Sequence, residues 1–174
     1  VLNEVMYKLR RRYGYGVVHG ILRVETPDLF ENKRLTGIQL RGLTLEAANG
    51  EPVSFRNSRL EHSYFNQSRL KRSIFDGAKL SNARFCDAEL ERASFRGANL
   101  SYANLNTLAA FVSELEPGNG TNLRGADFEG AILSGAQMRD ADLRQARFAD
   151  AILSYSDLSN TDLRGADLRA TYLS

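Results

Sequence analysis

The chain has 174 residues, of which 43% are hydrophobic and 25% charged, and its formal net charge is +2. This composition indicates one folded domain, excludes a disordered chain and indicates no particular partner. Because no apolar run reaches about 18 residues, we expect no membrane span. No signal peptide pattern opens the chain. The single cysteine, Cys86, excludes an internal disulfide and favours a reducing, cytoplasmic location.

Residues 1–34 precede the regular part of the sequence. Their apolar residues recur at helical spacing, at Leu2, Val5, Met6 and Leu9. This spacing predicts a short helix, which together with the stretch through Phe30 forms an N-terminal cap. The alternative is a basic docking element around the three arginines at positions 10–12, next to two tyrosines, a weak indication of nucleic-acid binding.

From residue 35 onward a large apolar residue returns at every fifth position, with a small residue two positions before it. In the first block, residues 35–105, the small residue is serine from Ser58 to Ser73 and alanine from Ala78 to Ala103. A period of five is neither that of a helix nor that of a plain strand. Three extended residues place the small and the large side chain on one face, and two further residues turn the chain. Such a chain coils around its own side chains, with successive coils about 4.8 Å apart.

Phenylalanine and leucine alternate strictly from Phe55 to Leu100. Four sides per coil, each of one repeat, therefore stack Phe on Phe and Leu on Leu, whereas three sides would stack Phe on Leu. We expect four sides. Gly50 occupies a position where the period calls for a leucine, and the stretch EAANGEP around it predicts a bulge or a corner loop.

The segment at 106–122 breaks the period, because the separation between Leu105 and Leu123 is not a multiple of five. Stacking Phe128 on a Phe column requires an odd number of five-residue steps across it. With one step, the rest of the segment forms a short helix that lies outside the coil. With three steps, the coil continues through the segment with a bulge at 116–120, and we favour this second arrangement. Irregular insertions in regular scaffolds often carry binding, so Phe111, Glu114, Glu116 and Asn119 are candidate protein-binding residues.

The second block, residues 123–174, resumes the period and is still in phase at its last residues. A four-sided coil stacks Arg124, Arg144 and Arg164 in one column beside a column of Asn122, Asp142 and Asp162. The two columns either neutralise each other or form a docking strip, and the three arginines are therefore candidate binding residues. The last coil would leave strand edges open, which predicts an end-to-end homodimer or a chain that continues as part of a larger adaptor protein.

The units GAKL, GANLS, GADFE, DADLR and GADLR resemble the A-(D/N)-L-x-x pattern of pentapeptide repeat proteins, over residues 35–174. The resemblance implies an all-β fold, a right-handed four-sided parallel β-helix. The early units depart from the pattern with serine for alanine and with Ile38, Leu43 and Val53 at small positions. We expect those coils to be wider or less regular.

No cluster of histidine, cysteine and carboxylate residues has the spacing of a metal site, and no motif indicates a catalytic or cofactor-binding residue. His62 falls at an outward corner, and Cys86 takes the outward slot after Phe85, where we expect it to be inert. We therefore expect a non-enzymatic protein–protein interaction scaffold without cofactor and without a nucleic-acid partner.

The resemblance also implies an alternative, a DNA-mimicking regulator of a DNA topoisomerase such as gyrase. Mimicry of DNA needs a strongly negative rod. From residue 51 onward the chain has 15 basic and 16 acidic residues, and this near-neutral balance argues against the alternative.

Overall fold

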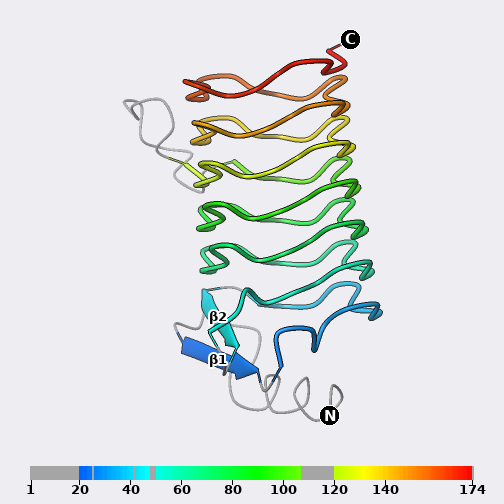
Figure 1. Ribbon diagram of the computed structural model, residues 1–174, viewed down its shortest axis with the longest axis vertical. Coiled ribbons are helices and arrows are strands. Elements are labelled where there is room, and N and C mark those ends of the chain that lie inside the picture. Colours follow the sequence, from blue (N-terminus) through cyan, green and yellow to red (C-terminus); the bar gives the residue numbers. More distant parts are fainter. Residues whose placement is uncertain (1–19, 25, 41, 48–49, 107–119, 174) are drawn as a thin grey trace.

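The computed structural model describes residues 20–24, 26–40, 42–47, 50–106 and 120–173. They form a rod of stacked coils that rises from the N-terminal to the C-terminal end of the chain (Figure 1). At the lower end two short parallel strands lie side by side, β1 (Gly20–Val24) and β2 (Leu43–Ala47), with Gly20 opposite Leu43. Above them the coils are joined by single parallel bridges, one on each side of the coil.

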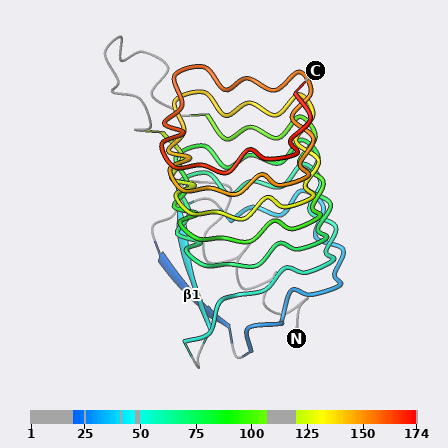
Figure 2. The same ribbon diagram turned by 45° about the horizontal axis from the view of Figure 1, so that its top comes forward.

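A regular coil consists of four repeats, one on each of its four sides. Ser54 pairs with Ile74, and Ile74 pairs with Ser94. Three further columns of parallel pairs start at Arg59, Tyr64 and Arg69. We number these sides 1 to 4 in chain order, starting with the column of Ser54. The four-sided parallel coil predicted from the Phe/Leu alternation is confirmed. The turned view shows the successive coils stacked on one another (Figure 2).

Each side ends in a tight turn. The amide of Ser58 donates to the carbonyl of Phe55 at 3.2 Å, and Asn57 between them has a φ of 54°. A positive φ at the third residue of a four-residue turn is typical of a type II turn. The equivalent residue has a positive φ at corners all around the rod. Glycine or asparagine often occupies it, because these residues adopt this conformation at low cost.

The Asp or Asn of the repeat pattern stabilises these turns. In the upper coils its side-chain oxygen accepts a hydrogen bond from the backbone amide two residues later, as in Ser101 to Asn99 at 3.0 Å and Glu129 to Asp127 at 3.0 Å. This is an Asx turn, in which the side chain takes the place of a backbone acceptor. The outward residue of the side thus directs the chain into the next corner.

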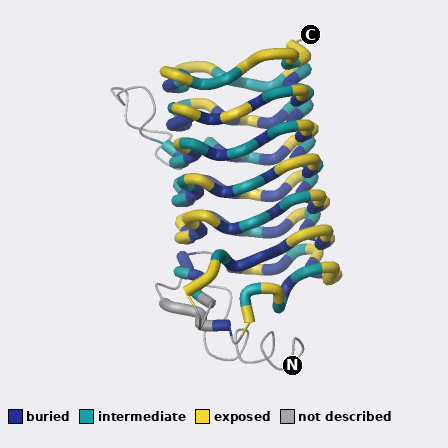
Figure 3. The backbone as a smooth tube through the Cα atoms, in the orientation of Figure 1, coloured by how far each residue is buried: buried dark blue, intermediate teal, exposed yellow. Residues whose placement is uncertain are grey.

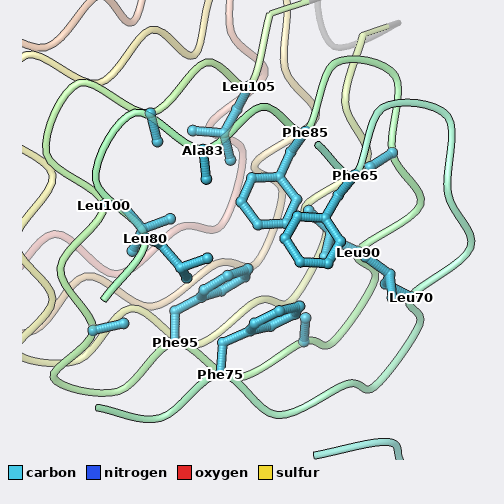
Figure 4. Packing of buried hydrophobic residues seen from close by; sticks show 14 of the residues in the cluster. Phe65, Leu70, Phe75, Leu80, Ala83, Phe85, Leu90, Phe95, Leu100 and Leu105 are labelled. Atoms are coloured by element: carbon cyan, nitrogen blue, oxygen red, sulfur yellow. The ribbon is translucent and has the colours of Figure 1, made fainter. Parts of the chain in front are cut away.

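The core is a continuous stack of phenylalanine and leucine side chains. Phe55, Phe75 and Phe95 of side 1 stack face to face with centroids 4.9 Å apart. Phe65 and Phe85 stack in the same way on side 3, and the two stacks meet edge to face at 5.7–6.0 Å (Figure 4). Face-to-face stacking along the rod and edge-to-face contact across it are both favourable geometries.

The small position of each repeat also points inward, and along the chain buried and exposed residues alternate (Figure 3). The alanines from Ala78 to Ala151 at this position are fully or almost fully buried, as are Ser58, Ser63, Ser68 and Ser73. The buried serine hydroxyls donate to backbone carbonyls, Ser63 to Leu35 at 3.3 Å and Ser58 to Phe30. Serine therefore substitutes for alanine where a carbonyl is within reach of its hydroxyl.

The first coil is longer than the others, as its bulky small-position residues predicted. The chain runs one repeat further between Arg34 and its partner Arg59 than in a regular coil, because five extra residues lie between the sides of Thr44 and Ser54. Gly50 belongs to this loop. The corner loop is confirmed. The expectation that Gly50 takes the leucine position of a regular repeat is wrong, because the five extra residues do not form a side of the coil.

The core begins before the first repeat that the period identifies. Val24 and Phe30, which precede residue 35, are buried, and Phe30 stacks on Phe55 at 4.9 Å. The stacked column of side 1 therefore starts with Phe30, below Leu35.

The break between the two blocks is bridged by a single step. Glu89 pairs with Asn122 across the break, and Phe128 accordingly stacks on Phe95 at 5.1 Å. The three-step arrangement that we favoured is wrong, since it would have placed Phe128 above Phe65. The amide of Asn122 donates to the carbonyl of Ala88 at 3.0 Å, so backbone pairing continues across the break in this register.

Two expectations for the N-terminal region have different outcomes. The helical stripe at positions 2–9 lies outside the described residues, and the helical cap stays a prediction. Gly20–Val24, within the segment expected to form the cap, is the strand β1 beneath β2. Within the described part of the chain, no helix is long and apolar enough to cross a membrane.

Candidate binding edges

The described residues contain no group of three or more His, Cys, Asp or Glu side chains that could hold a metal ion. His62 lies at an exposed corner with a φ of 58°, as expected. Cys86 follows Phe85 at a corner, as expected, and it is buried there because its Sγ lies 3.3 Å from Asn104 Oδ1. The asparagine of the next coil covers the thiol although the backbone of Cys86 is at a corner.

The charges along side 1 and its following corner alternate in sign from coil to coil. Arg96 donates to Asp127 at 3.1 Å and to Glu129 at 2.7 Å, and Arg147 donates to the same two carboxylates from the coil above. Lower down, Arg56 lies 3.5 Å from Asp76. This surface neutralises itself, and exposed pairs of this kind contribute little to stability or attraction.

The corner between sides 4 and 1 is different, because basic residues follow one another along it. The backbone keeps the coils in contact here, since the amide of Arg92 donates to the carbonyl of Arg124 at 2.9 Å. In the five coils above the first, one described residue of this corner is acidic, Glu91, and it contacts Lys71 at 3.7 Å. In the first coil the corner carries Glu46. We call the basic residues of this corner the arginine edge. Its members come from five successive coils and are Lys71, Arg72, Arg92, Arg124, Arg144 and Arg164.

The upper part of the arginine edge is paired with acidic side chains of side 4. Arg144 contacts Asp142 at 2.6 Å and Asp162 at 3.7 Å, and Arg164 contacts Asp162 at 2.6 Å. Hydrogen bonds from Arg164 lower the pKa of Asp162 to about 2. Burial raises the pKa of Asp142, but the hydrogen bonds from Arg144 outweigh it and the pKa lies below its ordinary value. The predicted double column is thus present and largely neutral.

The middle part of the arginine edge is not neutralised. Among the described residues, no carboxylate forms an ion pair with Arg72, Arg92 or Arg124, and in this sense we call their guanidinium groups free. Arg124 Nε donates to the uncharged side chain of Gln145 at 3.4 Å. All three arginines are exposed. Three consecutive coils therefore each present one free guanidinium group at the same corner.

A second unusual surface lies on the upper part of side 2 and at the corner after it. We call it the tyrosine surface: its members are Ile132, Ile152 and Tyr172 on the side and Tyr102 and Tyr155 at the corner. Tyr155 is 89% exposed and Tyr102 68%. A Cβ atom at Gly135 would lie 2.7 Å from the Tyr102 ring, so this ring rests on the glycine of the next coil. Lower on side 2 the same column is basic or polar, at Arg34, Arg59, Lys79 and Asn99.

The two surfaces lie on different parts of the rod. In a four-sided coil the corner between sides 4 and 1 is diagonally opposite the corner between sides 2 and 3, which carries Tyr102 and Tyr155. The neutralised side 1 separates the arginine edge from side 2. A partner that covers one surface therefore leaves the other open.

The structure places three of the seven predicted binding residues, namely Arg124, Arg144 and Arg164, on the arginine edge. Phe111, Glu114, Glu116 and Asn119 lie outside the described residues and stay predictions. Sequence analysis missed Arg72 and Arg92, although their position in the corner could have been read from the period of four repeats per coil. It also missed the tyrosine surface, since no single repeat reveals that residues as distant in sequence as Tyr102 and Tyr155 share one corner.

The four-sided parallel coil, its Asx turns and its one-residue-wide Phe and Leu columns define a β-helical repeat solenoid. The family profile of pentapeptide repeats matches eight copies, at residues 73–107, 119–145 and 141–174, which is more than half of the chain. The chain belongs to the pentapeptide repeat family, whose members form quadrilateral β-helices. A search of curated protein sequences finds no match.

Solved structures of other pentapeptide repeat proteins resemble this chain. Rfr23 from the cyanobacterium Cyanothece 51142 is 20% identical, with a TM-score of 0.41 and full coverage of both chains. HetL from the cyanobacterium Nostoc sp. strain PCC 7120, involved in heterocyst differentiation regulation, is 21% identical, with a TM-score of 0.35 and coverage of 95% and 94%. QnrB1, a plasmid-mediated fluoroquinolone resistance protein, is 18% identical, with a TM-score of 0.32 and coverage of 89% and 88%.

Proposed function

We propose that the protein is a non-enzymatic scaffold that binds protein partners along the edges of its rod. The observation that carries the proposal is the segregation of surface chemistry, with free guanidinium groups at one corner and tyrosine and isoleucine near the diagonally opposite corner. Arginine and tyrosine are enriched in protein interfaces, where they provide directed hydrogen bonds and large contact areas.

The fold supports this proposal through its rigidity. Backbone pairing on every side and the stacked core hold each corner residue in line with its neighbours above and below. A solenoid of this kind presents a long surface whose side chains keep their spacing without a partner. Binding to such a surface costs little ordering of the scaffold itself.

The alternative is DNA mimicry toward a topoisomerase, and the surface charge argues against it. A mimic of a phosphate backbone needs a continuous acidic row. On the sides of the rod, the longest acidic column among the described residues is the pair Asp142 and Asp162, and both are bonded to arginine. We expect no inhibition of gyrase supercoiling at protein concentrations that saturate partner binding. Inhibition that persists when the protein is diluted below those concentrations would favour the alternative.

The scaffold proposal is tested by affinity capture from the source cells with three matched baits. One is the intact chain, one carries Arg72→Gln, Arg92→Gln and Arg124→Gln, and one carries Tyr102→Ser, Ile132→Ser and Tyr155→Ser. We expect proteins captured by the intact chain to be lost with one surface variant and retained with the other. If every captured protein binds all three baits equally, neither surface is a binding site and the proposal fails.

A further inference from the structure

We propose that the arginine edge recognises an acidic α-helix of a partner protein, lying along the rod with one row of carboxylates against Arg72, Arg92 and Arg124. This inference rests on the proposed scaffold function and names the chemistry of its partner. It is carried by the free state of these three side chains among the described residues, their spacing, and the charges that flank them.

The first step concerns charge. The other basic residues of the arginine edge have carboxylate partners, for example Lys71 with Glu89 at 3.4 Å and Arg164 with Asp162 at 2.6 Å. The three free guanidinium groups are the exception within the edge. A guanidinium fork binds a carboxylate with two parallel hydrogen bonds, a stronger and more directed contact than a lysine makes. The complementary ligand is therefore a row of carboxylates.

The second step concerns spacing. The coils rise by the distance between stacked rings, 4.9 Å from Phe75 to Phe95 and 5.1 Å from Phe95 to Phe128. Arg72 and Arg92 occupy the same corner position in their coils, whereas Arg124 comes one residue earlier in its corner, before Gly125. On a helix, side chains three or four residues apart have Cβ atoms about 5–6 Å apart, and one turn rises about 5.4 Å. Over two coils, about 10 Å, a helix stays in step to within roughly 1 Å, which flexible arginine side chains accommodate.

An extended segment does not match this spacing. Same-face residues of a strand are about 6.6 Å apart, so a strand falls out of step with the coils by more than about 3 Å over the same length. The helix is therefore the better fit, with acidic residues at positions i, i+4 and i+7 facing the rod.

The third step concerns width, which separates a helix from a nucleic acid. The free arginines all lie within the width of one corner, Arg72 and Arg92 at its second residue and Arg124 at its first. Carboxylates lie on either side of this corner, at Glu89 and Asp142 on side 4 and at Asp127 on side 1. A duplex presents two rows of phosphates, and one of these rows would meet the flanking carboxylates. A helix with a single acidic stripe avoids them.

The test uses four fluorescently labelled probes and measures fluorescence anisotropy. The first is an Ala-rich peptide of about 18 residues with Glu at i, i+4, i+7 and i+11, which forms a helix at low temperature. The second has the same composition with the glutamates spread around the helix. The third places glutamate at every second residue between prolines, and the fourth is a single-stranded DNA of equal charge. We expect the striped helix to bind at least about tenfold more tightly than the other three, and more weakly as salt rises.

The protein variants locate the site. Arg72→Gln, Arg92→Gln and Arg124→Gln together should weaken binding of the striped helix at least about tenfold. The matched control removes three basic residues from side 2, with Arg34→Gln, Arg59→Gln and Lys79→Gln, and should change binding less than about twofold. Glutamine suits Arg72 and Arg92, whose φ is positive, because Gln67 and Gln145 already occupy positions of positive φ in this chain. Circular dichroism verifies that each variant is folded.

The outcomes distinguish this inference from the proposed function. Equal binding of the spread helix, the extended peptide or the DNA would overturn the acidic-helix assignment, as would absence of binding by all four probes. If affinity capture still shows a partner that depends on the arginine edge, the scaffold function stands and only the helix assignment fails. If no captured protein depends on either surface, both fail.

Discussion

The first coil and the coils above it solve the same packing problem in different ways. The regular coils turn every five residues and fill the inner corner with alanine, whereas the first coil is one repeat longer and buries Ile38, Leu43 and Val53 at those positions. Between these two regions, the four repeats from Ser58 to Ser73 have a buried serine at the small position. The comparison teaches that a small residue is needed only where the four-repeat coil is closed tightly, and that an extra repeat makes room for larger ones.

The largest expected effect tests how much the crossed phenylalanine stacks stabilise the regular coils. Phe85→Ala removes contacts with Phe65, Phe75 and Phe95 and should lower the free energy of unfolding by about 3–5 kcal/mol. Phe30→Ala, in the first coil, removes one stacked contact with Phe55 and should cost less. Denaturant unfolding followed by circular dichroism measures both. Equal losses would mean that the crossed stacks add nothing beyond burial.

The next effect tests the tightness of the regular coil at the small position. Ala98 is fully buried, and Ala98→Ile should lower the free energy of unfolding by about 1–3 kcal/mol through overpacking. Ala98→Ser is the control and should cost less than about 1 kcal/mol, since its hydroxyl can donate to the carbonyl of Phe95 as Ser68 does to Phe65. A neutral Ala98→Ile would show that the regular coils have the same room as the first.

A smaller effect tests the turns, which both regions share. Gly97 has a φ of 61°, and no atom lies within 4 Å of the position that a Cβ would take, so Gly97→Ala should cost about 1 kcal/mol through backbone strain alone. Gly135→Ala meets the Tyr102 ring as well and should cost more. Conversely, Gln67→Gly should stabilise the protein by up to about 1 kcal/mol, because Gln67 has a φ of 58°. Thermal unfolding of the three variants checks the order, and a stabilising Gly97→Ala would contradict it.

The smallest effect concerns pH and the last coils. Hydrogen bonds from Arg164 and Arg169 lower the pKa values of Asp162 and Asp167 to about 2, from an ordinary value of 3.8. A lowered pKa contributes stability that is complete above about pH 4 and is lost as the pH falls toward 2. We expect the unfolding temperature to fall over this range.

The control for the pH effect is the double variant Asp162→Asn and Asp167→Asn. Its unfolding temperature should fall less between pH 4 and pH 2 than that of the unaltered chain, because two of the titrating groups are gone. An identical pH dependence in both proteins would show that these two ion pairs do not stabilise the fold.

The sequence predicted the repeat and its geometry because the signal is local and repeated many times. The five-residue period requires three extended residues and a turn, and the Phe/Leu alternation selects four sides. The family profile begins its match at Ser73, just before alanine takes over the small position at Ala78. The coil nevertheless extends below that point, to Phe30, since buried serines and larger residues still close it.

The breaks were harder to predict, because the period holds no information where it stops. Both one and three steps across 106–122 satisfied Phe-on-Phe stacking, and only the backbone pairing of Glu89 with Asn122 decided for one. The binding surfaces depend on the same register. Arg72, Arg92 and Arg124 belong to three different repeats, and they share a corner only because the insertion between the two blocks preserves the stacking.

The amino-acid sequence by itself thus determined the coil, its inward residues and its turns, since each five-residue unit carries the physical requirement for its own conformation. The tertiary structure decided the register of the two blocks, the length of the first coil and the sharing of corners between distant repeats. These features arise from hydrogen bonds and ring contacts between coils, and such contacts join residues whose separation along the chain no local pattern specifies.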